Sequence, residues 1–348
     1  MVDFEVYRTA GIRALHAEPL YRPDDGHYQF KYLPAYAFAM APFAVVDDQV
    51  ARLAWFALSF GLLCAFVRAS ARAVPERRLT DGALITLAIL LAGKFYGHEL
   101  VLGQSNILLA TVLVAALLAS EAGMTRTAGV LLALGVIVKP YALLLLPWLW
   151  LVAGIPAVLS AVVTLAAALL LPALAYGWSG NLDQMAAWYG TVTRTTGPLL
   201  LATDNVSFAA LWAKWIGVGS AAETLTIITS AAAAAMAVLI VARRRGVREP
   251  AYLEFGVLML LVPLLSPQGW DYVLLMATPA FLVVVDRWRE TTVPWRALTV
   301  LAFAGLSFTF YDLLGRRLYV AVMGIDLIGI CAAVLLVCLV NLRIRKLA

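Results

Sequence analysis

Long apolar runs separated by short polar segments make up the chain from residue 49 onward. The runs lie at about 49–68, 81–96, 105–121, 127–138, 141–153, 154–175, 219–242, 251–266, 271–286, 297–313 and 319–341. A helix needs roughly 20 mainly apolar residues to cross a bilayer, and the longer runs reach this length. The pattern therefore predicts an all-α, polytopic integral membrane protein with about 11 transmembrane helices.

The runs at 127–138 and 141–153 are short, and Lys139-Pro140 separates them. Proline cannot continue a helix without the loss of a backbone hydrogen bond, so the helix should break here. We expect a hairpin of two half-length helices whose tip stops inside the bilayer.

The first 48 residues are more polar than the rest. Residues 4–16 predict a short amphipathic helix at the membrane interface, and the apolar stretch 33–46 is too short to cross, so it should lie half-sunk in the bilayer. The chain then forms one domain with four parts. These are an outer loop with interfacial helices at 1–48, an N-terminal helical module at 49–175, a second outer loop at 176–218 and C-terminal helices at 219–348.

The composition excludes a soluble domain of this size, because 63% of the 348 residues are hydrophobic and 14% are charged, with a mean hydropathy of +0.88. The formal net charge of +5 comes from Lys and Arg residues spread over short loops, which favours membrane topology over nucleic-acid binding. Cys64, Cys331 and Cys338 lie inside apolar runs and indicate neither a disulfide framework nor a metal motif.

Most of the basic residues fall on one set of loops, which the positive-inside rule makes cytoplasmic. They are Arg68, Arg72, Arg77, Arg78, Arg126, Arg243, Arg244, Arg245, Arg248, Arg287, Arg289, Arg296, Arg343, Arg345 and Lys346. The extracytoplasmic side then carries the N-terminal loop, the segment 98–106, Lys139 and the loop 177–214, so we expect the chemistry on that face of the cell (plasma) membrane. Met1 would lie outside with no helix to carry it across, so either the first 48 residues translocate as a tail or, as we expect, the natural chain begins further upstream with an additional span.

Three polar side chains, those of Gln104, Asn106 and Lys139, lie at the ends of apolar helices. Hydrocarbon cannot solvate them, so we expect them to meet at one wet surface. Lys139 either binds an anionic group there or reaches from a helix end to water. Gln104 and Asn106 either hydrogen-bond a ligand or cap the helix that follows.

Five groups of short motifs occur in order along the chain. They are Asp3-Phe4-Glu5-Val6-Tyr7 with Pro19-Leu20-Tyr21 and Phe30-Lys31-Tyr32-Leu33-Pro34, then Gly103-Gln104-Ser105-Asn106, Val138-Lys139-Pro140, Asp204-Asn205-Val206-Ser207 and Ser266-Pro267-Gln268-Gly269-Trp270-Asp271-Tyr272. Together they resemble glycosyltransferase family 87, whose members are GT-C-type integral membrane enzymes. The resemblance implies a hexosyltransferase, similar to mannosyltransferases. Such an enzyme moves a sugar, best matched by mannose, with inversion from a polyprenyl-phosphate donor to a hydroxyl of a lipid or glycan acceptor.

The resemblance also implies roles for particular residues. Asp3 matches the acidic residue at the start of the family's first outer loop, so it is the candidate base; otherwise it is a solvated terminal carboxylate. Lys139 is the candidate for binding the donor phosphate, and Arg194 in the second outer loop is a further candidate. The candidates for binding sugar or acceptor are Gln104, Asn106, Asn205, Gln268, Trp270 and Asp271. Asn205 could equally begin a helix, and Trp270 could anchor a span at the interface.

The chain departs from the family pattern in three places. The family's membrane helix does not occur before Asp3, which leaves the placement of that carboxylate open. Asn205-Val206-Ser207 stands where Asn-Gln-Ser is common, and Tyr272 stands where some members have histidine. The last two departures leave the sugar and the acceptor open.

We expect no metal or other cofactor. Asp24, Asp25 and His27 lie in a loop with Pro and Gly, which is typical of a solvated segment. A phosphate leaving group can depart to a lysine or arginine without a divalent ion. Asp326 falls within the last apolar run, where we expect it to pair with Arg316 or Arg317.

A transporter or flippase of a lipid-linked saccharide is the alternative function. Such a protein needs polar groups along a path through the membrane and often has inverted repeats. Here the polar residues gather at one end of the apolar runs, and no repeat is evident. Convergence of Asp3, Gln104, Lys139 and Asn205 on one outward cavity would favour the enzyme.

Overall fold

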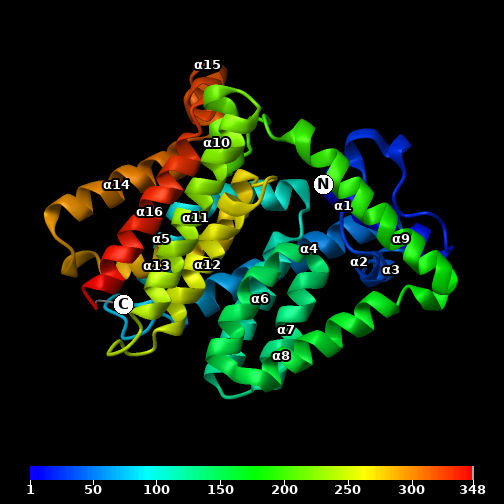
Figure 1. The fold of residues 1–348 in the computed structure, drawn as a ribbon, viewed down its shortest axis with the longest axis horizontal. Coiled ribbons are helices and arrows are strands. Elements are labelled where there is room, and N and C mark those ends of the chain that lie inside the picture. Colours follow the sequence, from blue (N-terminus) through cyan, green and yellow to red (C-terminus); the bar gives the residue numbers. More distant parts are fainter. Residues whose placement is uncertain (347–348) are drawn as a thin grey trace. The chain divides into compact units, whose positions relative to one another are not determined.

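The computed structural model describes residues 1–346, and within them it contains helices and no β-strand (Figure 1). The elements are α1 (Val2–Leu15), η1 (Pro23–Tyr28), α2 (Pro34–Ala39), α3 (Ala41–Ala44), α4 (Asp48–Arg72), α5 (Asp81–Leu102), α6 (Asn106–Glu121), α7 (Thr125–Val138), η2 (Pro140–Leu145), α8 (Leu146–Leu170), α9 (Ala173–Thr196), η3 (Gly197–Leu199), α10 (Phe208–Ile216), α11 (Ser220–Ala242), α12 (Ala251–Leu265), η4 (Asp271–Ala277), α13 (Thr278–Asp286), η5 (Trp288–Glu290), α14 (Val293–Phe308), α15 (Tyr311–Gly324) and α16 (Leu327–Ile344). The predicted all-α class is confirmed.

The described chain divides into two compact units, and each boundary inside the first hundred residues falls within a helix. Unit 1 contains Met1–Phe66 and His98–Gly197, and unit 2 contains Val67–Gly97 and the chain from Pro198 onward. The first boundary lies in α4 and the second in α5. Each unit is described below by itself.

Several helices are long and apolar enough to cross a membrane, so the predicted polytopic membrane protein is confirmed. Within residues 1–346 these are five: α4, α5, the stretch Pro140–Leu170, α11 and α16. A sixth results if α14 and α15, which are bent by 103° at their junction, form one broken span. Three further apolar helices, α6, α7 and α12, are shorter.

Judged by length and composition, fewer helices could therefore cross a membrane than the 11 that we predicted. The predicted spans 141–153 and 154–175 overlap the single apolar stretch Pro140–Leu170, which the non-helical Gly154 (φ 73°, ψ −172°) divides into two helices at the predicted boundary. The predicted span 271–286 begins as the 3₁₀ helix η4, so its α-helical part, α13, has only 9 residues. A run of apolar residues thus overstates the length of regular helix.

The core of unit 1 contains α6, α7 and α8, which run side by side (Figure 1). Close approach depends on glycine: a Cβ at Gly129 would collide with the Ala157 carbonyl, and one at Gly135 would lie 2.9 Å from Leu113. α7 ends at Val138, Lys139 is extended (φ −147°, ψ 119°), and Pro140 begins η2. The predicted break at Lys139-Pro140 is confirmed.

The N-terminal segment of unit 1 folds onto the start of α4. α1 buries Phe4 and Tyr7 against α2 and α3, and Phe4 stacks on Trp55 of α4 with ring centroids 5.4 Å apart. The short helix predicted at 4–16 is confirmed as α1. The stretch 33–46 forms only α2 and α3, which have 6 and 4 residues and are too short to cross a membrane.

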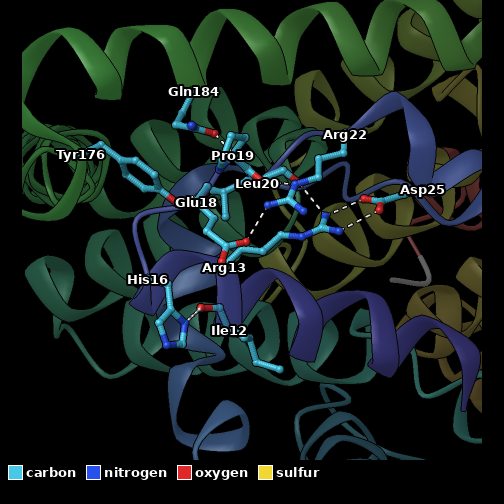
Figure 2. Close-up of polar contacts among 10 residues, drawn as sticks. All are labelled: Ile12, Arg13, His16, Glu18, Pro19, Leu20, Arg22, Asp25, Tyr176 and Gln184. Carbon is cyan, nitrogen blue, oxygen red and sulfur yellow. Dashed lines mark hydrogen bonds and ion pairs between the residues drawn. The ribbon is translucent and has the colours of Figure 1, made fainter.

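The loop after α1 is tied to α1 and to α9 (Figure 2). Arg13 donates to both carboxylate oxygens of Asp25 at 2.6 and 2.7 Å. From α9, Tyr176 donates to the Glu18 carbonyl at 2.7 Å, and Gln184 accepts from the Leu20 amide at 3.1 Å. The segment predicted as a second outer loop is therefore largely helical, and its helix α9 holds the first loop in place.

The core of unit 2 contains α12, which packs against α11, α13 and α16. Glu254 of α12 is fully buried and forms ion pairs with Arg343 at 3.5 Å and Arg244 at 3.4 Å. A buried carboxylate is tolerated when cations compensate its charge. This cluster joins the ends of α11, α12 and α16.

Candidate active site

The loop Gly103–Asn106 connects α5 to α6 in unit 1 and carries the first group of candidate residues. Gly103 has φ +72°, and a Cβ there would lie 2.9 Å from that of Phe4, so the loop requires glycine on both counts. Trp55 donates to the Gly103 carbonyl at 2.9 Å. These contacts hold the loop against the N-terminus of α1.

Gln104 lies at the centre of the polar contacts in unit 1. Its Oε1 accepts from the hydroxyl of Tyr7 at 2.8 Å, from that of Tyr32 at 3.2 Å and from Nζ of Lys139 at 3.3 Å. Because these donors take the carbonyl oxygen, the amide nitrogen is the atom available to hydrogen-bond Asp3. One side chain thus joins an acid to an ammonium group.

Lys139 is buried, with 9% of its surface exposed. Its Nζ lies 5.5 Å from the ring centroid of Tyr32 and 5.9 Å from that of Tyr141. Both distances are within the range of cation–π attraction. An ammonium group held between aromatic faces, away from bulk water, interacts strongly with any anion that reaches it.

Asp3 lies half-buried in the first turn of α1. Burial raises the pKa of its carboxyl group above the ordinary 3.8, whereas the hydrogen bond with Gln104 and the charges of Lys139 and His27 lower it in part. A carboxylate with a raised pKa is a better proton acceptor than an ordinary aspartate at neutral pH. Asp3, Gln104 and Lys139 therefore form one connected set.

Asn106 is buried and fully engaged within unit 1. Its Nδ2 donates to Oε2 of Glu99 at 2.9 Å, and its Oδ1 accepts from the Tyr141 hydroxyl at 2.7 Å. The start of α6 is capped by the Glu99 carboxylate, which accepts from the backbone amides of Asn106 and Ile107. The alternative that Gln104 or Asn106 caps this helix is therefore wrong, because the capping carboxylate belongs to Glu99.

Four candidates lie in unit 2, where two distant segments pair. Asn205 and Trp270 form an isolated antiparallel bridge, Asn205 donates from Nδ2 to the Pro267 carbonyl at 2.8 Å, and the Asp271 amide donates to the Asp204 carbonyl at 2.9 Å. This pairing brings Asn205, Gln268, Trp270 and Asp271 to one place. The Trp270 ring stacks on that of Tyr272 with centroids 6.4 Å apart.

The remaining candidate, Arg194, lies exposed in the last turn of α9, where it donates to the Thr191 hydroxyl at 3.5 Å. The candidates thus gather in two groups: Asp3, Gln104, Asn106 and Lys139 in unit 1, and the four residues around Trp270 in unit 2. A single basin that contains all of them stays a prediction. Within residues 1–346, no three His, Cys, Asp or Glu side chains lie together as a metal site.

Sequence reasoning missed the aromatic and acidic neighbours of these residues. Tyr7 and Tyr32 stand inside the quoted motifs, and Tyr141 directly follows Lys139-Pro140. Glu99 lies just after the apolar run 81–96, but the helix α5 continues past it to Leu102, so its burial could not be inferred from the run alone. In unit 2 the Tyr319 hydroxyl donates to Asp204, a contact for which the sequence holds no signal.

A comparison with models of protein families assigns the chain to a known family. The family model described as glycosyltransferase family 87 matches residues 30–267, more than half of the chain. The matched region contains Gln104, Asn106, Lys139, Arg194 and Asn205. It begins after Asp3 and ends before Gln268, Trp270 and Asp271. No curated protein matches the chain.

Proposed function

Because the chain belongs to glycosyltransferase family 87 and is a membrane glycosyltransferase, we propose that it uses a polyprenyl-phosphate sugar as donor. The transferred sugar is a hexose, best matched by mannose, and the acceptor is a hydroxyl group of a lipid or glycan. Transfer takes place at the extracytoplasmic face of the plasma membrane with inversion at the anomeric carbon.

The observation that carries this proposal is the connection of Asp3 to Lys139 through Gln104. In inverting transfer the acceptor oxygen forms a bond to the anomeric carbon while the bond from that carbon to the phosphate oxygen breaks. The acceptor proton passes to a carboxylate, and the bonding electron pair leaves with the phosphate. The reaction needs a base and a cation near each other, and this set supplies both.

Asp3 acts as the base in this proposal. Its raised pKa favours uptake of the acceptor proton, and the hydrogen bond from Gln104 orients the carboxylate. Lys139 binds the donor phosphate. As the bond to the anomeric carbon breaks, negative charge grows on the phosphate, and a buried ammonium stabilises that charge more than one in water would.

The other candidates bind donor or acceptor in the same proposal. Arg194 is a further phosphate ligand, and Gln268 and Asp271 hydrogen-bond sugar or acceptor hydroxyls. Trp270 offers the face of its ring to a sugar. Asn106 and Asn205 have amide groups that are hydrogen-bonded within the protein, so their contact with the sugar stays a prediction.

Transfer of labelled mannose from polyprenyl-phosphate mannose, measured in membranes that contain the natural full-length protein, tests the proposal. We expect Asp3→Asn to lower the rate by about 10²–10⁴-fold, the usual contribution of a general base. Glu5→Gln is the matched control, because Glu5 lies on the same helix, has 42% of its side chain exposed and pairs with Arg52 at 2.6 Å.

The control should keep its rate, and both variants should insert at native levels. An undiminished rate in Asp3→Asn would falsify the assignment of the base. Movement of the lipid-linked sugar across the membrane without transfer would instead support a flippase.

A further inference from the structure

Glu99 is a buried carboxylate that the proposed reaction does not use. It lies in the last turns of α5 with its side chain fully buried. A carboxylate in such a position persists when its charge is compensated by donors or cations. The identity of those donors indicates what Glu99 does.

The loop Gly103–Asn106 and the first residue after it donate hydrogen bonds to Glu99. Its Oε1 accepts from the backbone amides of Asn106 and Ile107, and its Oε2 accepts from the Asn106 side chain at 2.9 Å. Its own backbone carbonyl accepts from the amides of Gly103 at 3.0 Å and Gln104 at 3.1 Å. One residue therefore holds both ends of this loop.

Each end of the loop leads to a contact of Lys139. At one end, the Gln104 carbonyl oxygen accepts from Nζ of Lys139 at 3.3 Å. At the other, Asn106 accepts from the Tyr141 hydroxyl at 2.7 Å, and the Tyr141 ring centroid lies 5.9 Å from the same Nζ. The Glu99 carboxylate also attracts Lys139 through its charge.

We propose that Glu99 is a positioning residue for the transfer reaction: by binding both ends of the Gly103–Asn106 loop it sets Lys139, and through Gln104 also Asp3, in the geometry that transfer needs. The inference rests on the proposed function. Glu99 itself touches neither donor nor acceptor and acts through the loop.

The orientation of the Asn106 amide makes this proposal testable. An ionised carboxylate only accepts hydrogen bonds, so Glu99 obliges Asn106 to present its NH₂ group and to turn its oxygen toward Tyr141. In Glu99→Gln, the introduced NH₂ group would face that of Asn106, donor against donor. In Asn106→Asp, two carboxylates would face each other. The double variant restores one donor and one acceptor and keeps the total charge.

The experiment compares Glu99→Gln, Asn106→Asp and the double variant with the native full-length protein. The kcat and KM for labelled polyprenyl-phosphate mannose are measured in membranes, together with the midpoint of thermal unfolding. We expect each single variant to lower kcat about tenfold or more, with the donor KM little changed, and the double variant to recover to within about threefold of native. Glu121→Gln, which changes an exposed carboxylate at the other end of α6, is the control and should keep native kcat.

Recovery of kcat in the double variant shows that Glu99 and Asn106 act as a hydrogen-bonded pair. If each substitution only damaged the structure, the double variant would instead combine the two losses of kcat. The proposal is overturned if the losses of the two single variants multiply in the double variant. It is also overturned if Glu99→Gln keeps native kcat, or if the double variant stays misfolded. If the native protein transfers no sugar, the proposed function fails. The coupling of Glu99 to Asn106 is then read from the unfolding midpoints, and midpoints that do not recover overturn it independently.

Discussion

Trp55 connects three parts of unit 1, so its substitution should destabilise the fold in graded steps. Its side chain is 2% exposed, its ring stacks on Phe4 at 5.4 Å and meets Phe43 edge-on at 5.4 Å, and its Nε1 donates to the Gly103 carbonyl at 2.9 Å. The residue thus joins α4 to α1, to α3 and to the loop that carries Gln104.

The expected magnitudes follow from what each substitution removes. Trp55→Ala removes the buried ring and should cost about 3–5 kcal/mol of unfolding free energy. Trp55→Phe keeps an aromatic ring but leaves the Gly103 carbonyl without its indole donor, which should cost about 1–3 kcal/mol. Phe56→Ala is the control: Phe56 is the next residue of the same helix and is 43% exposed, so its loss should cost roughly 0.5 kcal/mol or less.

Loss of helical circular dichroism on heating in detergent measures these differences. At about 1.4 °C per kcal/mol for a chain of 348 residues, Trp55→Ala should lower the midpoint by about 4–7 °C and Trp55→Phe by about 1–4 °C. A midpoint in Trp55→Ala equal to that of Phe56→Ala would refute the reasoning, because the buried cluster would then contribute no more than an exposed ring.

Two further predictions concern charge. Burial raises the pKa of Asp3 above 3.8, so transfer should be lost as the pH falls through a value above the pKa of an ordinary aspartate. Gln104→Met removes a hydrogen bond that lowers this pKa. The variant should therefore move the acidic limb of the pH profile of kcat/KM to higher pH. An unmoved limb would contradict the assignment. In unit 2, Lys214 donates to three backbone carbonyls and lies near the buried Asp326. Lys214→Met should lower the free energy of unfolding by about 1–3 kcal/mol, and adding Asp326→Asn should recover part of this loss. If thermal unfolding shows that the two losses add, the two residues do not act as a pair.

The ion pair predicted for Asp326 was wrong in its partner. We expected Arg316 or Arg317, because they are near in sequence and the residue falls in an apolar run. Asp326 instead lies in the turn before α16, in a left-handed conformation with φ +56°, and the cation that acts on it is Lys214 of α10. Contacts between elements far apart in sequence decide such a pairing, and sequence spacing does not report them.

Local chemistry made some features predictable. Proline has no backbone N–H, so the break at Lys139-Pro140 follows from two residues alone. The gathering of Gln104 and Lys139 follows from the cost of leaving polar groups in hydrocarbon. The tyrosines that complete the site could not be predicted, because Tyr7, Tyr32 and Tyr141 come from three segments whose meeting depends on the packing of α2 against α1 and α7.

Other features depend on geometry that composition does not encode. Residues 176–218 read as a loop because they are polar, yet most of them form α9 and α10. The bridge between Asn205 and Trp270 joins two motifs that are far apart in the chain. Both motifs could be recognised as candidates, but their pairing requires the fold of unit 2.

An amide at position 104 suits the proposed chemistry better than a charged side chain would. A direct ion pair between Asp3 and Lys139 would hold the aspartate pKa low and weaken it as a base, and it would occupy the ammonium that the phosphate needs. Gln104 accepts from Lys139 and hydrogen-bonds Asp3, so it links the two groups without neutralising either. Burial raises the pKa of Asp3, and because Lys139 acts on the carboxylate across Gln104 rather than in a direct ion pair, its positive charge lowers that pKa only in part.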